Sequence, residues 1–252
     1  KNISSVYKTL ADEILPQLRR ARLTANYDVI GRSDEEINEA FDTDAKVLSA
    51  NELLYAATLT NDKARQEAIY KKTTELYPND FRAYNNLGMM AYANGDFTTA
   101  ENYFKQAASK DANAPEVNTN LGYIELVKGN VANAETYLSK STGANTANEA
   151  LGNLYIKQGQ YDRAVQAFGD TKTNSAALAQ ILAKDYNKAK NTLNAVKNPD
   201  AYTDYLMAIV GARTNNADLV KTSMAKVAQK DATLAAKAQI DREFAKYANE
   251  IK

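Results

Sequence analysis

Two asparagines at equivalent points of a repeated pattern are the side chains best suited to chemistry in this 252-residue chain. Asn86 and Asn120 lie 34 residues apart, each directly before a Leu-Gly pair. An amide can both donate and accept hydrogen bonds, so a row of amides can follow the backbone of an extended peptide. Tyr92 and Tyr123 accompany them, and tyrosine suits protein interfaces. The chemistry predicted by these residues is non-covalent recognition.

Reactive side chains of other kinds are missing or scattered. The chain contains no cysteine and no histidine, which excludes thiol nucleophiles, disulfides, serine–histidine–aspartate triads, histidine general bases and the usual zinc sites. Catalysis by carboxylates alone, or by lysine and tyrosine, is still compatible with this composition. However, no pair of acidic residues stands out from the charged helix faces. We therefore expect no enzyme activity, no cofactor and no metal site.

Charge and hydropathy limit the partners further. The 31 basic and 31 acidic residues balance, and no basic tract extends beyond Arg19-Arg20, so we expect no nucleic-acid partner. No long apolar run is present, so we expect no direct membrane insertion by this segment.

The elements that would position the asparagines are helical hairpins with a period of 34 residues. The segment 84–104 recurs as 118–138. In each copy one glycine lets two helices approach closely, a second glycine ends the first helix, and an alanine is the matching small residue on the second helix. These positions are Gly88, Gly95 and Ala100, then Gly122, Gly129 and Ala134. We expect Gly122 to face Ala134, with Phe104 in the core.

This period and these positions resemble the tetratricopeptide repeat. The resemblance implies an all-α, right-handed solenoid of antiparallel helical hairpins, about five or six between residues 49 and 232. At Lys184, which replaces the turn glycine, we expect a different turn because a left-handed lysine is strained. Residues 233–251 have the apolar spacing of one amphipathic capping helix.

First-helix residues that avoid the core of such a solenoid would line its concave groove. A competing interpretation is that they are ordinary solvated polar residues, and Ala150, which interrupts the asparagine ladder in the third copy, favours it. The two tyrosines fit partly buried positions as well as anchors. No complete lysine/arginine clamp for a terminal carboxylate is present. The candidate peptide-binding residues are Arg82, Asn85, Asn86, Met89, Tyr92, Thr119, Asn120, Tyr123 and Asn153, with Glu116 and Glu149 beside them.

The first 45 residues follow a different pattern. Apolar spacing predicts a helix over 3–15, and alternation over 21–30 predicts a strand. Ser33 and Glu36 form a predicted capping box that opens a short helix. We therefore expect an N-terminal helix–strand appendage over 1–45 and a repeat solenoid with its capping helix over 46–252.

The segments 15–37 and 50–88 resemble OmpA-like, repeat-containing envelope proteins of Bacteroidetes, and the similarity covers essentially the whole chain, including the ending EFAKYANEIK. The resemblance implies a periplasmic location associated with the outer membrane. It also implies that residues 1–45 are the remnant of an OmpA-like domain. Peptidoglycan would then be bound only through a separate domain of a longer protein.

Two functions fit these observations. The leading hypothesis is a non-enzymatic protein–protein interaction scaffold of the bacterial cell envelope, which binds a protein or peptide on the concave face of the repeats. The alternative is a structural spacer or assembly chaperone for an outer-membrane protein complex. A saturable affinity that groove substitutions abolish would support the scaffold.

Overall fold

The computed structural model describes residues 7, 8, 12, 31–249 and 251, and within these the chain is all-α, with no strand. The predicted strand over 21–30 lies outside the described residues, as does most of the helix predicted over 3–15, so the N-terminal helix–strand appendage is not supported. The helices are α3 (Asp34–Asp44), η2 (Ala45–Val47), α4 (Ala50–Ala56), α5 (Lys63–Leu76), α6 (Phe81–Ala93), α7 (Phe97–Lys110), α8 (Pro115–Lys128), α9 (Val131–Leu138), α10 (Ala147–Lys157), α11 (Tyr161–Phe168), α12 (Asn174–Leu182), α13 (Tyr186–Asn194), α14 (Ala201–Arg213), α15 (Ala217–Lys230), α16 (Ala232–Ala238) and η3 (Arg242–Tyr247).

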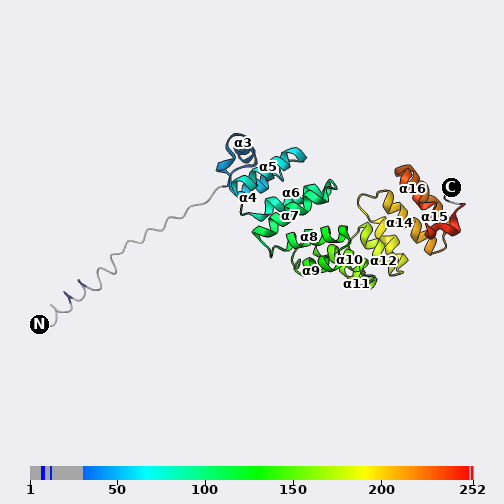
Figure 1. The fold of residues 1–252 in the computed structure, drawn as a ribbon. Coiled ribbons are helices and arrows are strands. Elements are labelled where there is room, and N and C mark those ends of the chain that lie inside the picture. Colours follow the sequence, from blue (N-terminus) through cyan, green and yellow to red (C-terminus); the bar gives the residue numbers. More distant parts are fainter. Residues whose placement is uncertain (1–6, 9–11, 13–30, 250, 252) are drawn as a thin grey trace.

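The helices from α4 to α15 pair into six consecutive hairpins over the described range, within the predicted five or six. The hairpins stack side by side into a curved array (Figure 1). The first helices of neighbouring hairpins contact one another in the series α6, α8, α10, α12 and α14. In Figure 1, α8 and α10 lie toward the inner side of the bend, whereas α9 and α11 lie toward the outer side. A continuous face is thus built from first helices.

The start of the described fold is set by helix capping. Ser33 and Glu36 form the predicted capping box of α3, in which the Ser33 hydroxyl accepts from the Glu36 N–H at 3.2 Å and Glu36 accepts from the Ser33 N–H at 2.8 Å. Ile37 on α3 and Ala45 lie in one buried cluster with Leu53 and Ile69 of the first hairpin. The helix therefore shares a core with the repeats, while the division of the chain at residue 45 stays a prediction.

The turns inside the hairpins follow the predicted glycine rule. Gly95, Gly129 and Gly159 have left-handed φ angles of 78°, 80° and 73°. Asp96 then caps α7 by accepting from the Thr99 N–H at 3.0 Å. Asn130 holds the equivalent position one repeat later, where an asparagine side chain could cap α9, but it forms no such cap. It donates instead to the Glu125 carboxylate at 3.0 Å.

The turn at Lys184 contradicts the sequence-based expectation. Lys184 adopts the same left-handed conformation as the glycines, with φ of 65°. The Asp185 N–H donates to the Gln180 carbonyl at 2.8 Å, and the Asp185 side chain caps α13 at the Lys188 N–H, 3.1 Å away. These bonds offset a left-handed strain of about 1 kcal/mol, so the ordinary turn is kept.

The seam glycines face the bulky residue of the second helix, and not the alanine that the sequence suggested. A Cβ added to Gly122 would lie 2.5 Å from Leu138, whereas no Ala134 atom is among its three nearest neighbours, the third of which is 3.5 Å away. Gly88 stands against Phe104 in the same way, also at 2.5 Å. Each glycine therefore makes room for a large side chain in the core.

The two ends of the array deviate from the repeat pattern. In the first hairpin Gln66 replaces the usual alanine, and its amide donates to the Ala57 and Thr60 carbonyls at 3.1 and 2.8 Å. At the C-terminus the predicted single helix is two, α16 and η3, because Asp241 starts a new helix by accepting from the Glu243 N–H at 2.9 Å. Phe244 of η3 is buried in the same cluster as α14 and α15.

Candidate peptide-binding groove

The candidate residues lie on α6, α8 and α10, the first helices of three successive hairpins. One pair among them is not solvated. The Asn120 amide donates to the Asn85 side-chain oxygen at 2.8 Å, and each residue is only 8% exposed. A buried polar group is stable only when it is hydrogen-bonded, so this pair joins α6 to α8 and forms part of the groove floor.

A small hollow opens beside that pair. Four predicted residues line it, Met89, Tyr92, Asn120 and Tyr123, and its volume is about 90 Å³. The Tyr92 and Tyr123 rings lie 6.3 Å apart between centroids, which is within the range of favourable aromatic contact. Its walls are thus mainly aromatic and aliphatic, with Asn120 and Thr146 adding an amide and a hydroxyl.

The two tyrosines of the hollow are held neutral. Burial raises the pKa of the Tyr92 hydroxyl. Burial also raises the pKa of Tyr123, and the nearby Glu149 carboxylate adds to that effect. A phenol of ordinary pKa, about 10, is already protonated at physiological pH, and the upward shifts only reinforce this, so both hydroxyls can donate hydrogen bonds to a ligand.

A second hollow of about 380 Å³ lies one repeat earlier, between α5 and α6. Asn86 lines it in the place that Asn120 takes in the first hollow, together with Tyr70 and Gln66. Met89 lines both hollows and is 43% exposed. The predicted asparagine ladder thus corresponds to two equivalent hollows with an exposed methionine between them.

Three predicted residues are committed to other contacts. Arg82 binds the Asp80 carboxylate and donates to the Asn51 side-chain oxygen at 2.8 Å. Thr119 is fully buried and its hydroxyl donates to the Pro115 carbonyl at 2.8 Å, so its assignment to the groove surface is wrong. Asn153 donates to the Glu149 backbone carbonyl at 3.1 Å.

Sequence reasoning missed eight residues that line the hollows: Lys63, Gln66, Tyr70, Met90, Ala93, Asn94, Phe104 and Thr146. Tyr70 and Phe104 are 34 residues apart, and this spacing marks them as one repeated position. Phe104 was assigned to the core alone, although the same ring also closes the floor of the smaller hollow. Thr146 lies just before α10, in the linker where the repeat spacing shortens, so its position could not be read from the period.

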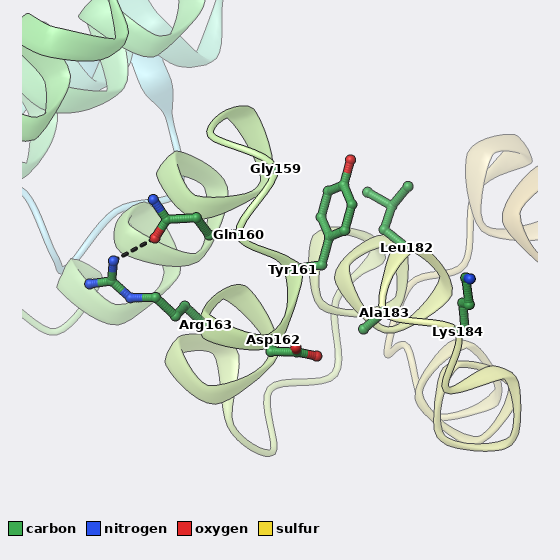
Figure 2. Close-up of a pocket in the computed structure, with 8 residues that line it drawn as sticks. All are labelled: Gly159, Gln160, Tyr161, Asp162, Arg163, Leu182, Ala183 and Lys184. Carbon is green, nitrogen blue, oxygen red and sulfur yellow. Dashed lines mark hydrogen bonds between the residues drawn. The ribbon is translucent and has the colours of Figure 1, made fainter.

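Another pocket, of about 370 Å³, lies between the α10–α11 and α12–α13 turns. Figure 2 shows Arg163 turned toward Gln160, with Tyr161, Leu182 and Lys184 on the other side. Arg163 also donates to the Tyr155 hydroxyl at 2.9 Å. None of the candidate groove residues lines this pocket.

The part of the chain that the structure describes lacks two further kinds of feature. No group of three or more acidic, histidine or cysteine side chains there could hold a metal ion. No helix there combines the length and apolar character needed to cross a bilayer.

Family models of the tetratricopeptide repeat match residues 69–102, 86–149 and 149–172. Tetratricopeptide repeats are present in this chain. The matched segments contain α6 to α11, which carry all of the candidate groove residues. A comparison with curated protein sequences gives no match.

Several solved structures share this fold at low sequence identity. The APC/C hetero-tetramer Cut9–Hcn1 has a TM-score of 0.68 at 15% identity over 85% of this chain, which spans 44% of that one. A tetratricopeptide repeat protein from Parabacteroides merdae has a TM-score of 0.58 at 12% identity, covering 99% of this chain and 96% of that one. PilW, a type IV pilus biogenesis factor, has a TM-score of 0.54 at 18% identity, covering 78% and 97%. The likeness establishes a tetratricopeptide-type solenoid.

Proposed function

We propose that this protein is a non-enzymatic interaction scaffold that binds an extended protein segment across the first-helix face of its repeats. The observation that carries the proposal is the pair of equivalent hollows at Asn86 and Asn120, with Met89 between them. Tetratricopeptide folds act as protein-interaction scaffolds, and repeat solenoids offer extended concave surfaces for such partners.

The size of the smaller hollow narrows the ligand class. Sites for drug-sized molecules and cofactors usually have volumes of about 300–1,000 Å³, and this one is about 90 Å³. Its aromatic walls suit one apolar side chain, while Asn86 in the neighbouring hollow offers an amide to the peptide backbone. The ligand would therefore be a peptide with an apolar residue at the position over Tyr92 and Tyr123.

We further propose a place in the bacterial envelope, in the periplasm under the outer membrane. The resemblance to OmpA-like envelope proteins supports this proposal. So does the fold shared with PilW, a type IV pilus biogenesis factor. Any contact with peptidoglycan would come from a separate domain of a longer protein.

The test uses a partner recovered from envelope extract and titrated by calorimetry. The variant is Asn86→Ala with Met89→Ala, because both side chains are at least partly exposed and neither belongs to the buried pair. Losing one hydrogen bond of about 0.5–1.5 kcal/mol and one apolar contact of similar size should weaken binding roughly fivefold to a hundredfold.

Asn191→Ala on the outer helix α13 is the matched control, since Asn191 is exposed and lies outside both hollows. It should bind as the unchanged protein does. If the double variant and the control bound the partner with equal affinity, the binding site would not lie on this face. That result would favour the alternative, a spacer or assembly chaperone without sequence-specific recognition.

A further inference from the structure

A separate cleft of about 490 Å³ lies between the second helices α13 and α15, above part of α14. It shares no lining residue with the candidate groove, which is built on α6, α8 and α10. Leu193, Met207 and Leu219 supply apolar atoms to its walls. The cleft is therefore a second recessed surface, in a different part of the array.

The charge of this cleft is unbalanced. Three lysines line it, Lys190, Lys226 and Lys230, against one acidic residue, Asp204. Asp204 is already paired with Lys230 at 2.7 Å. Lys190 and Lys226 form no ion pair with any residue that the structure describes. Two exposed lysines at the cleft are thus left without a carboxylate partner among the described residues, and a recessed surface concentrates the resulting positive potential.

Uncharged polar groups accompany these lysines. Ser223 is only 4% exposed and lines the cleft. Asn194 contributes an exposed amide at the rim. A hydroxyl and an amide can each donate a hydrogen bond to an acceptor on a ligand. Apolar wall residues, the ammonium groups and these polar side chains together match a ligand with both carboxylates and an apolar side chain.

We propose that this cleft binds an acidic peptide segment, with carboxylates at Lys190 and Lys226 and an apolar side chain over Met207. A nucleic acid fits less well, because no aromatic ring lines the cleft to stack on a base. The site is independent of the first-helix groove. A solenoid with both sites would hold two partners at once, on different helices.

The experiment measures fluorescence anisotropy of a labelled ten-residue peptide of alternating glutamate and leucine. The variant Lys190→Gln with Lys226→Gln removes both unpaired charges. Each charge contact at a partly exposed site contributes modestly, so binding should weaken about threefold to thirtyfold. An uncharged peptide of alternating glutamine and leucine should bind the unchanged protein no more tightly than the acidic peptide binds the double variant.

The matched control is Lys140→Gln with Lys157→Gln, which changes the net charge equally at exposed lysines outside the cleft. It should bind the acidic peptide like the unchanged protein. Equal weakening by both double variants would mean that overall charge alone attracts the peptide, and would overturn the site. Displacement of the peptide by micromolar inorganic phosphate would also overturn it, in favour of a small-anion pocket.

Two further measurements distinguish binding in this cleft from a folding defect and from binding in the first-helix groove. Circular dichroism should be unchanged in the Lys190/Lys226 variant, because both lysines are exposed. The Asn86/Met89 groove variant should retain full affinity for the acidic peptide. If the groove variant lost that affinity, the peptide would lie in the first-helix groove and the cleft proposal would be wrong.

Discussion

At Gly88 a single missing methyl group allows the core to close. An added Cβ would lie 2.5 Å from the Phe104 ring, which is fully buried and rigid. Overpacking of this kind costs about 1–3 kcal/mol, while alanine gains about 1 kcal/mol over glycine in a helix. We expect Gly88→Ala to lower the free energy of unfolding by up to about 2 kcal/mol, measured by urea denaturation.

Gly31→Ala is the control, because a Cβ there meets no atom within 4 Å. Its unfolding curve should match that of the unchanged protein. Phe104→Leu introduced beside Gly88→Ala should recover part of the lost stability. Two independent, additive losses in the double variant would show that the glycine and the ring are not in contact.

Asn86 and Asn120 occupy one repeat position, yet they should respond differently to substitution. Asn120→Ala leaves the buried Asn85 side chain without its partner, which costs about 1–3 kcal/mol. Asn86 is less buried, so Asn86→Ala should leave the stability within about 0.5 kcal/mol of the original. Thermal unfolding of the two variants checks this. Equal midpoints would mean that the amide pair contributes nothing to the fold.

The same contrast shows how far the site could be predicted. Spacing alone placed both asparagines on the first-helix face, and Met89, Tyr92 and Tyr123 do line hollows there. Spacing could not show that Asn120 meets Asn85, because that contact crosses from one hairpin to the next. The sequence placed Thr119 on the first helix of the third hairpin. It did not show that this side of the helix is buried.

At the scale of one element, α8 carries a buried carboxylate that holds its hairpin together. Glu125 is 8% exposed and accepts from the Asn130 and Asn133 amides at 3.0 and 3.1 Å. Lys128 lies 3.2 Å from Glu125 and 2.6 Å from Glu101 of α7. Burial works against the charged form, but the hydrogen bonds and Lys128 outweigh it and lower the pKa of Glu125.

A lowered pKa makes this hairpin sensitive to acid. The stabilisation from Glu125 is complete above the carboxyl's ordinary pKa, about 4.3, and is lost as the pH falls through the lower folded-state value. We expect Glu125→Gln to be less stable at pH 7 and to lose less stability between pH 5 and 2, measured by urea denaturation across that range. The exposed Glu116→Gln is the charge-matched control. Parallel pH profiles for Glu125→Gln and the unchanged protein would contradict this account.

Turns were the best predicted elements, and their errors have a physical cause. Glycine positions gave the left-handed turns at Gly95, Gly129 and Gly159. The expectation failed at Lys184 because it weighed the strain of one residue and not the hydrogen bonds around the turn. The C-terminal helix was predicted to be too long for a similar reason. The apolar spacing continues past Asp241, but the Asp241 side chain caps a new helix.

At the scale of the whole molecule, the array should not unfold as one unit. Phe244, Tyr247 and Ile251 cover the last hairpin and are buried with α14 and α15. Removing residues 240–252 would uncover that cluster, and loss of one buried phenylalanine alone costs about 3–5 kcal/mol. Because repeats contact only their neighbours, hydrogen exchange should speed up in α14 and α15 and stay slow in α6 to α9.

Phe244→Ala should reproduce the effect in weaker form, without shortening the chain. Faster exchange spread evenly over all hairpins would instead mean that the solenoid is one cooperative unit.

The general architecture was predictable, since a 34-residue period requires neighbouring copies to bury one another. The packing of the ends was not, because no copy of the period describes a residue that has a neighbour on one side only.

The second helices have unequal lengths. Those toward the two ends of the array, α5, α7 and α15, contain 14 residues each, whereas α9, α11 and α13 contain 8, 8 and 9. A shorter helix packs along less of its partner, so the middle of the array resists deformation less than its flanks. The stiffness of the array therefore varies along its length. Under tension between its termini in an optical trap, it should extend first between α8 and α13; simultaneous rupture of all hairpins would show that the stiffness is uniform.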